Sequence, residues 1–184
     1  MIVTLTKTPK AKPADETKLG FGRIFTDHMF MMDSEKGVWK DERIVPYGPL
    51  QLDPAATVLH YGQEIFEGLK AYKSADGRTL LFRAKDNFRR MNDSCERLCM
   101  PKLDVDKTYD ALCELIKVDE DWVPKSRGPS LYIRPTMIGI DAKLGVDAAD
   151  HNLFYIICSP SGAYYSTGLA PVKIYVEDEY VRAV

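Results

Sequence analysis

The strongest local folding signals lie in GLKAYKSADGRTLLFRAKDNFRRMNDSCERL, residues 68–98 of a 184-residue chain. Residues 68–73 and 78–83 favour two short strands, and the turn residues SADG stand between them. Because Asp-Gly readily adopts the positive φ angles that a tight hairpin turn requires, Asp76 and Gly77 predict a β-hairpin at this point.

A helix is predicted directly after this hairpin. The apolar residues Phe88, Met91, Cys95 and Leu98 recur at offsets of 3, 7 and 10 from the first, which places them on one face of a helix. Asp86 precedes them and can cap the start of the helix.

Four further strands are expected outside this stretch. Pro135 interrupts one of them, and because proline has no N–H to donate, it predicts an edge position or a bulge. Another is a continuous apolar run, which favours a strand buried on both faces. These strands cover residues 24–32, 130–140, 153–158 (the apolar run) and 172–176.

The remaining segments complete the fold class. Residues 41–54 carry three prolines and are predicted to be largely irregular. A second helix is expected with a cap near Asp106, because Tyr109, Leu112, Cys113 and Ile116 would share one face. Strands and helices in this mixed order predict an α+β fold, an α/β sandwich on a mainly antiparallel sheet.

Composition narrows the class of protein. A hydrophobic fraction of 45%, a charged fraction of 28% and a net charge of −2 fit a globular protein with no electrostatic reason to bind nucleic acid or a membrane. Residues 1–20 are polar, which favours a flexible arm over a signal or transit peptide. Four cysteines without a CxxC pair predict neither a metal site nor a disulfide framework, and therefore a reducing cytoplasm.

Aromatic residues gather in HYGQEIFEGLKAY, residues 60–72. Tyr61, Phe66 and Tyr72 surround Glu67-Gly68, where the glycine suggests a helix end or a tight bend. Such aromatics could line a pocket or could belong to the core.

Two arginines have two interpretations each. Arg90 lies on the polar side of the predicted helix, where it could pair with Asp86 or could bind a phosphate with its planar fork of donors. Arg134 shares a strand face with Tyr132, and the two could bind a carboxylate or could face water. The glycine-containing loops 143–146 and 161–165 could make interfaces or close over a ligand.

Taken in this order, the segments resemble the branched-chain aminotransferases, which are class IV, fold-type IV pyridoxal-phosphate enzymes. The resemblance implies a small N-terminal domain at 21–170, followed by a linker and the start of a large domain at 171–184. No lysine here matches the family's Schiff-base lysine, Lys173 included. That lysine is expected beyond Val184, so the chain alone is expected to be inactive. The matching segments are FGRIFTDHMF, LHYGQEIFEGLKAY, LFRAKDNFRRM, LYIRP, the LGV loop, GAY and EYVRAV.

The resemblance also implies a role for each candidate residue. Arg90 matches the arginine that holds the phosphate of pyridoxal 5'-phosphate, and Arg134 matches the one that accepts the distal carboxylate of glutamate. Leu144 and Val146 match a loop that reaches the partner's active site in a homodimer. The substrate-pocket matches are Phe21, Tyr61, Phe66, Tyr132, Arg134 and Tyr164.

The implied reaction moves the amino group of leucine, isoleucine or valine to 2-oxoglutarate, with amino acids and 2-oxo acids as small-molecule partners. Two alternatives within the same family are a D-amino-acid aminotransferase and an aminodeoxychorismate lyase. An alternative from another class is a non-catalytic binding or dimerisation module.

Overall fold

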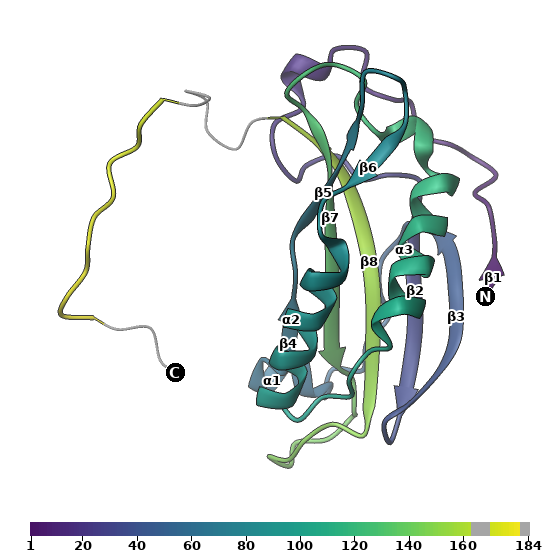
Figure 1. The fold of residues 1–184 in the computed structure, drawn as a ribbon. Coiled ribbons are helices and arrows are strands. Elements are labelled where there is room, and N and C mark those ends of the chain that lie inside the picture. The colour runs from purple at the N-terminus through teal and green to yellow at the C-terminus, as the bar shows by residue number, and fades with distance from the viewer. Residues whose placement is uncertain (163–169, 181–184) are drawn as a thin grey trace.

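The computed structural model describes residues 1–162 and 170–180, and one eight-stranded sheet forms their centre (Figure 1). The strand order is β1-β3-β2-β8-β7-β5-β6, with β4 beside β7, and only β1 and β3 pair in parallel. The predicted α+β fold on a mainly antiparallel sheet is confirmed. The strands are β1 (Ile2–Val3), β2 (His28–Glu35), β3 (Val38–Pro46), β4 (Glu64–Phe66), β5 (Leu69–Lys73), β6 (Thr79–Leu81), β7 (Ser130–Gly139) and β8 (His151–Ser161).

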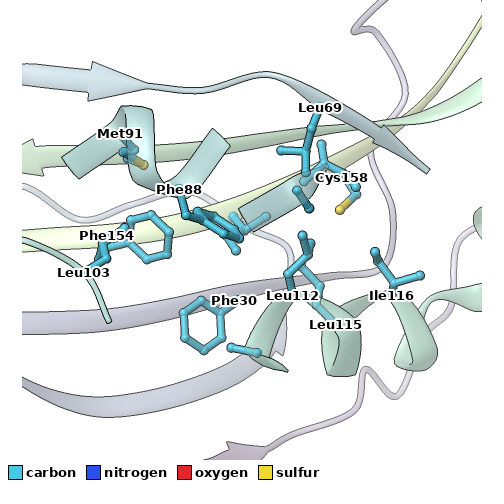
Figure 2. Close-up of a cluster of buried hydrophobic side chains, with 14 of the residues drawn as sticks. Phe30, Leu69, Phe88, Met91, Leu103, Leu112, Leu115, Ile116, Phe154 and Cys158 are labelled. Atoms are coloured by element: carbon cyan, nitrogen blue, oxygen red, sulfur yellow. The ribbon is translucent and has the colours of Figure 1, made fainter. Parts of the chain in front are cut away.

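Two helices, α2 (Ala84–Arg97) and α3 (Val105–Val118), cover one face of this sheet (Figure 1). The shorter helices are α1 (Thr57–Tyr61) and the 3-10 turns η1 (Glu16–Lys18) and η2 (Glu120–Trp122). The hydrophobic core lies between the two long helices and the sheet, as Figure 2 shows. Its fully buried side chains include Phe88, Leu112, Phe30, Phe154 and Ile156. Each such side chain contributes roughly 1.5–3 kcal/mol relative to an exposed one.

The alternation of β8 decides which face of the sheet remains available for a site. Phe154, Ile156 and Cys158 belong to the core beneath the helices. The residues between them, Tyr155 and Ile157, therefore point to the opposite face, because successive strand side chains alternate. Both are only partly buried, so this second face is the less covered of the two.

The predicted hairpin is confirmed, the predicted cap at Asp86 is wrong, and the cap expected near Asp106 lies two residues earlier. Asp86 lies inside the first turn of α2, where its carboxylate binds the side chains of Arg83 and Arg89. The second helix begins after Asp104, whose carboxylate accepts hydrogen bonds from the backbone of Asp106 at 3.1 Å and of the residue after it. The extended backbone of Asp104 gives it the conformation that a capping residue needs.

Three predicted segments differ from the observed ones. The strand expected at 24–32 is β2, which begins at His28 and continues to Glu35. Residues 41–54 are irregular only after Pro46, because β3 extends to that residue. Residues 172–176 form no strand and are exposed.

Pro135 is neither at an edge nor in a bulge, contrary to the prediction. It lies in β7, opposite Ile156 of β8 in an unbroken register. Its carbonyl accepts a hydrogen bond from Glu67 N at 2.9 Å. Because the nitrogen and the carbonyl of one residue in an antiparallel pair face the same neighbouring strand, the nitrogen of Pro135 also faces the side of Glu67. There β4 ends at Phe66 and β5 begins at Leu69. The missing donor therefore falls at a break between two short strands, where the ladder is already interrupted.

Residues 1–20, where a flexible arm was expected, make specific contacts with the domain. β1 pairs with β3, Thr6 N donates to His28 Nε2 at 2.9 Å, and Lys10 N donates to Asp27 Oδ1 at 2.8 Å.

In the described part of the chain, none of the helices has the length and apolar character that a membrane crossing requires.

Candidate cofactor and substrate site

Tyr132 and Arg134 lie on the face of β7 that points away from the helices. Arg134 Nη2 donates a hydrogen bond to Tyr132 Oη at 2.8 Å. The guanidinium carbon is 4.4 Å from the ring centre of Phe66 and 5.3 Å from that of Tyr132. The arginine is therefore held between two aromatic rings, whose negative faces stabilise a cation.

Phe21 closes this group from the N-terminal segment. Its ring and that of Tyr132 meet edge to face, with the two ring centres 4.9 Å apart. A cavity of about 310 Å³ lies beside the pair. Within the described residues, buried Arg134 Nε has no hydrogen-bond partner, whereas most buried donors in folded proteins have one. The cavity is lined by Phe21, Gly22, Phe25, Tyr132, Arg134, Ile157 and Ser159.

Gly68 touches the same group from the break between β4 and β5. A Cβ atom at this position would lie 2.4 Å from Tyr132 Oη, well inside ordinary contact. Only glycine fits there without moving the tyrosine hydroxyl. Gly68, which suggested a helix end, in fact lies at the break between β4 and β5. The C-terminal cap of α1 is Gly62, whose φ is 60°.

Arg90 on α2 is paired with Glu67, not with Asp86 as one of the two interpretations had it. Arg90 Nε and Nη2 donate to the two carboxylate oxygens of Glu67, each at 2.6 Å. Burial alone would raise the pKa of Glu67, but hydrogen bonds from Arg90 and Asn87 outweigh it and lower that pKa. The arginine side chain remains 68% exposed.

The geometry around Arg90 fits the phosphate group that the resemblance implies. A guanidinium carries five N–H donors, and Glu67 engages two of them. The remaining donors belong to an exposed side chain, where a phosphate could reach them. Nearby, a cavity of about 280 Å³ is lined by Gly68, Leu69, Lys70, Tyr72, Phe82, Asn87 and Tyr132.

Tyr61 lies in a different group from the other predicted pocket residues. Its hydroxyl donates to the carbonyl of Leu144 at 2.5 Å. Leu144 and Val146 are 67% and 85% exposed. Tyr61 and Val146 both line a shallow hollow of about 290 Å³. Tyr61 thus belongs with the exposed loop and not with Arg134.

A partly buried carboxylate holds this loop in place. Burial alone would raise the pKa of Asp141, but hydrogen bonds from the backbone of Asp150 and His151 and from the side chains of His151 and Lys143 hold that pKa at about 2. The loop that carries the exposed Leu144 is therefore anchored at its base by an ionised group.

No protein-family model matches the chain. Individual relatives do. Transaminase 1 for branched-chain amino acids from Bacillus subtilis (strain 168) is 55% identical over 95% of this chain and 49% of its own length. Aminotransferase 2 from the same organism is 53% identical over 99% of this chain and 50% of its own. The chain thus spans about half the length of the curated relatives it matches.

A solved structure adds a fold match. A branched-chain amino acid aminotransferase from T.th., solved with pyridoxamine 5'-phosphate, aligns with a TM-score of 0.52 and 26% identity, over 72% of this chain and 40% of that one. This chain is related to the branched-chain aminotransferases. The mixed sheet with few helices matches the N-terminal domain of such structures.

The structure shows which of the candidate residues lie together. The structure brings Phe21, Phe66, Tyr132 and Arg134 together, and it places Tyr61 elsewhere. Tyr164 lies outside the described residues.

Sequence reasoning gave no role to Glu67, which the structure places between the two arginine groups. An acidic residue between the aromatic Phe66 and the apolar Leu69, in a stretch that otherwise favours a buried strand, was the available signal. Ile157 and Ser159 were also missed, because only the pairing of β8 with β7 places them beside Arg134.

Proposed function

We propose that this chain forms the phosphate anchor and the substrate-pocket wall of a branched-chain-amino-acid transaminase. That enzyme would move the amino group of leucine, isoleucine or valine to 2-oxoglutarate. The observation that carries the proposal is Arg134, a cation held between the rings of Phe66 and Tyr132 beside an otherwise largely apolar cavity.

This arrangement suits a pocket that must take both an acidic and an apolar side chain in turn. Arg134 would bind the distal carboxylate of glutamate or 2-oxoglutarate through its remaining donors. Tyr132 accepts a hydrogen bond from Arg134, so its own hydroxyl proton is available to the same carboxylate. When a branched side chain is bound instead, Phe21, Phe66 and Ile157 would surround it, and the arginine would keep its aromatic contacts.

Arg90 would hold the phosphate of pyridoxal 5'-phosphate in the proposed enzyme. Arginine suits this role because its fork of donors matches the oxygens of a phosphate. When bound, the cofactor supplies an electron sink for the bond changes at the substrate Cα. The residues of this chain contribute by holding the phosphate and by orienting the substrate side chain.

We further propose that the enzyme works as a cytoplasmic homodimer. The exposed Leu144 and Val146 would reach a second copy, and Tyr61 would move with them because it binds the carbonyl of Leu144. Large apolar side chains that extend from an anchored loop are typical of an interface. The four unpaired cysteines fit a reducing compartment.

The test is turnover by the purified full-length protein. Leucine and 2-oxoglutarate should give 2-oxoisocaproate and glutamate, while D-alanine with 2-oxoglutarate and aminodeoxychorismate alone should give no product. The chain 1–184 should be inactive in the same assay, because none of its lysines matches the Schiff-base lysine of the branched-chain aminotransferases. Product from D-alanine in place of leucine would support a D-amino-acid aminotransferase, and product from aminodeoxychorismate would support an aminodeoxychorismate lyase. No product from any of the three substrates would support a non-catalytic binding module.

A further inference from the structure

We infer that Glu67 is the positioning residue for the phosphate-binding arginine: it holds the Arg90 guanidinium in place so that its outer donors face a phosphate monoester. This inference rests on the proposed function, because that proposal assigns the phosphate to Arg90. Glu67 itself touches neither substrate nor phosphate.

Glu67 is a fixed part of the fold. Its side chain is only 5% exposed, and its backbone N–H donates to the Pro135 carbonyl at 2.9 Å. Besides Arg90, its carboxylate accepts hydrogen bonds from Asn87 Nδ2 at 3.0 Å and from Gly68 N at 3.3 Å. A buried carboxylate with this many donors stays where the strands place it and does not yield to a ligand.

Arg90 depends on that carboxylate for its orientation. The side chain is 68% exposed, and Glu67 engages it from one side through Nε and Nη2. Two parallel hydrogen bonds fix the plane of a guanidinium, which a single contact would leave free to rotate. The Nη1 donors and the second Nη2 donor then point away from Glu67. Without the pair, binding a phosphate would have to order the long side chain, which weakens affinity about two- to tenfold.

A negative charge beside a phosphate site also has an opposite effect. Glu67 repels a phosphate, so removing its charge could strengthen binding. The exposure of Arg90 favours the positioning effect. Solvent and salt screen the repulsion between Glu67 and a phosphate at an exposed site, but they do not restore the fixed orientation of the Arg90 side chain. The two effects predict opposite signs for Glu67→Gln, which makes the inference testable.

The first measurement is the Arg Nε–Hε region of a ¹H–¹⁵N spectrum of the ligand-free chain 1–184. Loss of a signal in Arg90→Lys identifies the Arg90 resonance. We expect that signal to be sharp in the wild type and broadened or absent in Glu67→Gln. Asp86→Asn is the matched control on the same helix: it should remove the signal of Arg83, whose Nε binds Asp86, and preserve that of Arg90.

The second measurement is titration of the same variants with pyridoxal 5'-phosphate and, separately, with inorganic phosphate. The Arg90 signal of the wild type should shift, and Glu67→Gln should bind about two- to tenfold more weakly, as estimated for an unordered side chain. Asp86→Asn should bind like the wild type. Melting temperatures of all variants show whether each remains folded at the temperature used.

The outcomes separate this inference from the proposed function. If the wild type shows no response to either phosphate, the proposed anchor is refuted and the role of Glu67 with it. If the wild type responds and Glu67→Gln binds equally well or more tightly, the positioning role alone is overturned, and Glu67 acts as a counter-charge.

Discussion

Gly68→Ala should destabilise the domain by about 1–3 kcal/mol, the usual cost of overpacking a filled space. The new Cβ would lie 2.4 Å from Tyr132 Oη, whereas ordinary contact begins at 3.4 Å. The hydroxyl must therefore move by about 1 Å, which strains its 2.8 Å hydrogen bond from Arg134. The backbone of Gly68 is not left-handed, so the cost comes from this contact and not from the conformation of the main chain.

Urea unfolding of the chain 1–184 measures this cost directly. Gly48→Ala is the control, because a Cβ there would meet nothing within 4 Å. In a Tyr132→Phe background the clashing oxygen is absent, and the nearest ring atom would lie at 3.2 Å, so most of the Gly68→Ala penalty should disappear. A penalty for Gly68→Ala within about 0.5 kcal/mol of that for Gly48→Ala, or one of equal size in both backgrounds, would exclude the contact with Tyr132 as its cause.

Two further perturbations test the loop that carries the exposed apolar residues. Asp141→Asn should destabilise the domain by about 2 kcal/mol at pH 7, because hydrogen bonds hold the pKa of Asp141 at about 2. A lowered carboxyl pKa stabilises above the unfolded value, so the wild-type advantage in urea unfolding should shrink below about pH 4 and vanish near pH 2. Asp147→Asn, on the same loop, serves as the control, and an advantage that persists at pH 2 would count against this cause. Leu144→Asp combined with Val146→Asp should shift the full-length protein from dimer toward monomer in light scattering, while an unchanged mass would exclude this loop from the interface.

The sequence predicted best where the signal is local. The hairpin at Asp76-Gly77 and the buried side chains of α2 follow from neighbouring residues, because turn chemistry and helical spacing need no distant partner. Asp104 and Asp106 are both plausible caps by residue type, and only the extended backbone of Asp104 decides between them. Pro135 misled for a related reason, since an edge is defined by which distant strands pair and not by the residue itself.

In the candidate site, too, the features set by neighbouring residues were predictable and those set by distant residues were not. Tyr132 and Arg134 were predicted to share a face because strands alternate, and they do. Whether that face is covered could not be predicted, because Phe21 reaches Tyr132 from more than a hundred positions earlier. The ion pair of Arg90 with Glu67 spans 23 positions and competes with nearer acids such as Asp86, so residue spacing on the helix favoured the wrong partner.

In the proposed enzyme, Arg134 would bind the acidic substrate while the surrounding aromatic residues would contact the branched one. The measurement that tests this assignment most directly is the steady-state kinetics of Arg134→Lys in the full-length protein with leucine and 2-oxoglutarate. We expect the KM for 2-oxoglutarate to rise at least about tenfold, because paired charge-assisted hydrogen bonds to the carboxylate are lost. The KM for leucine should stay within about twofold, since the apolar contacts remain. Equal rises in both KM values, or a rise for leucine alone, would contradict the claim.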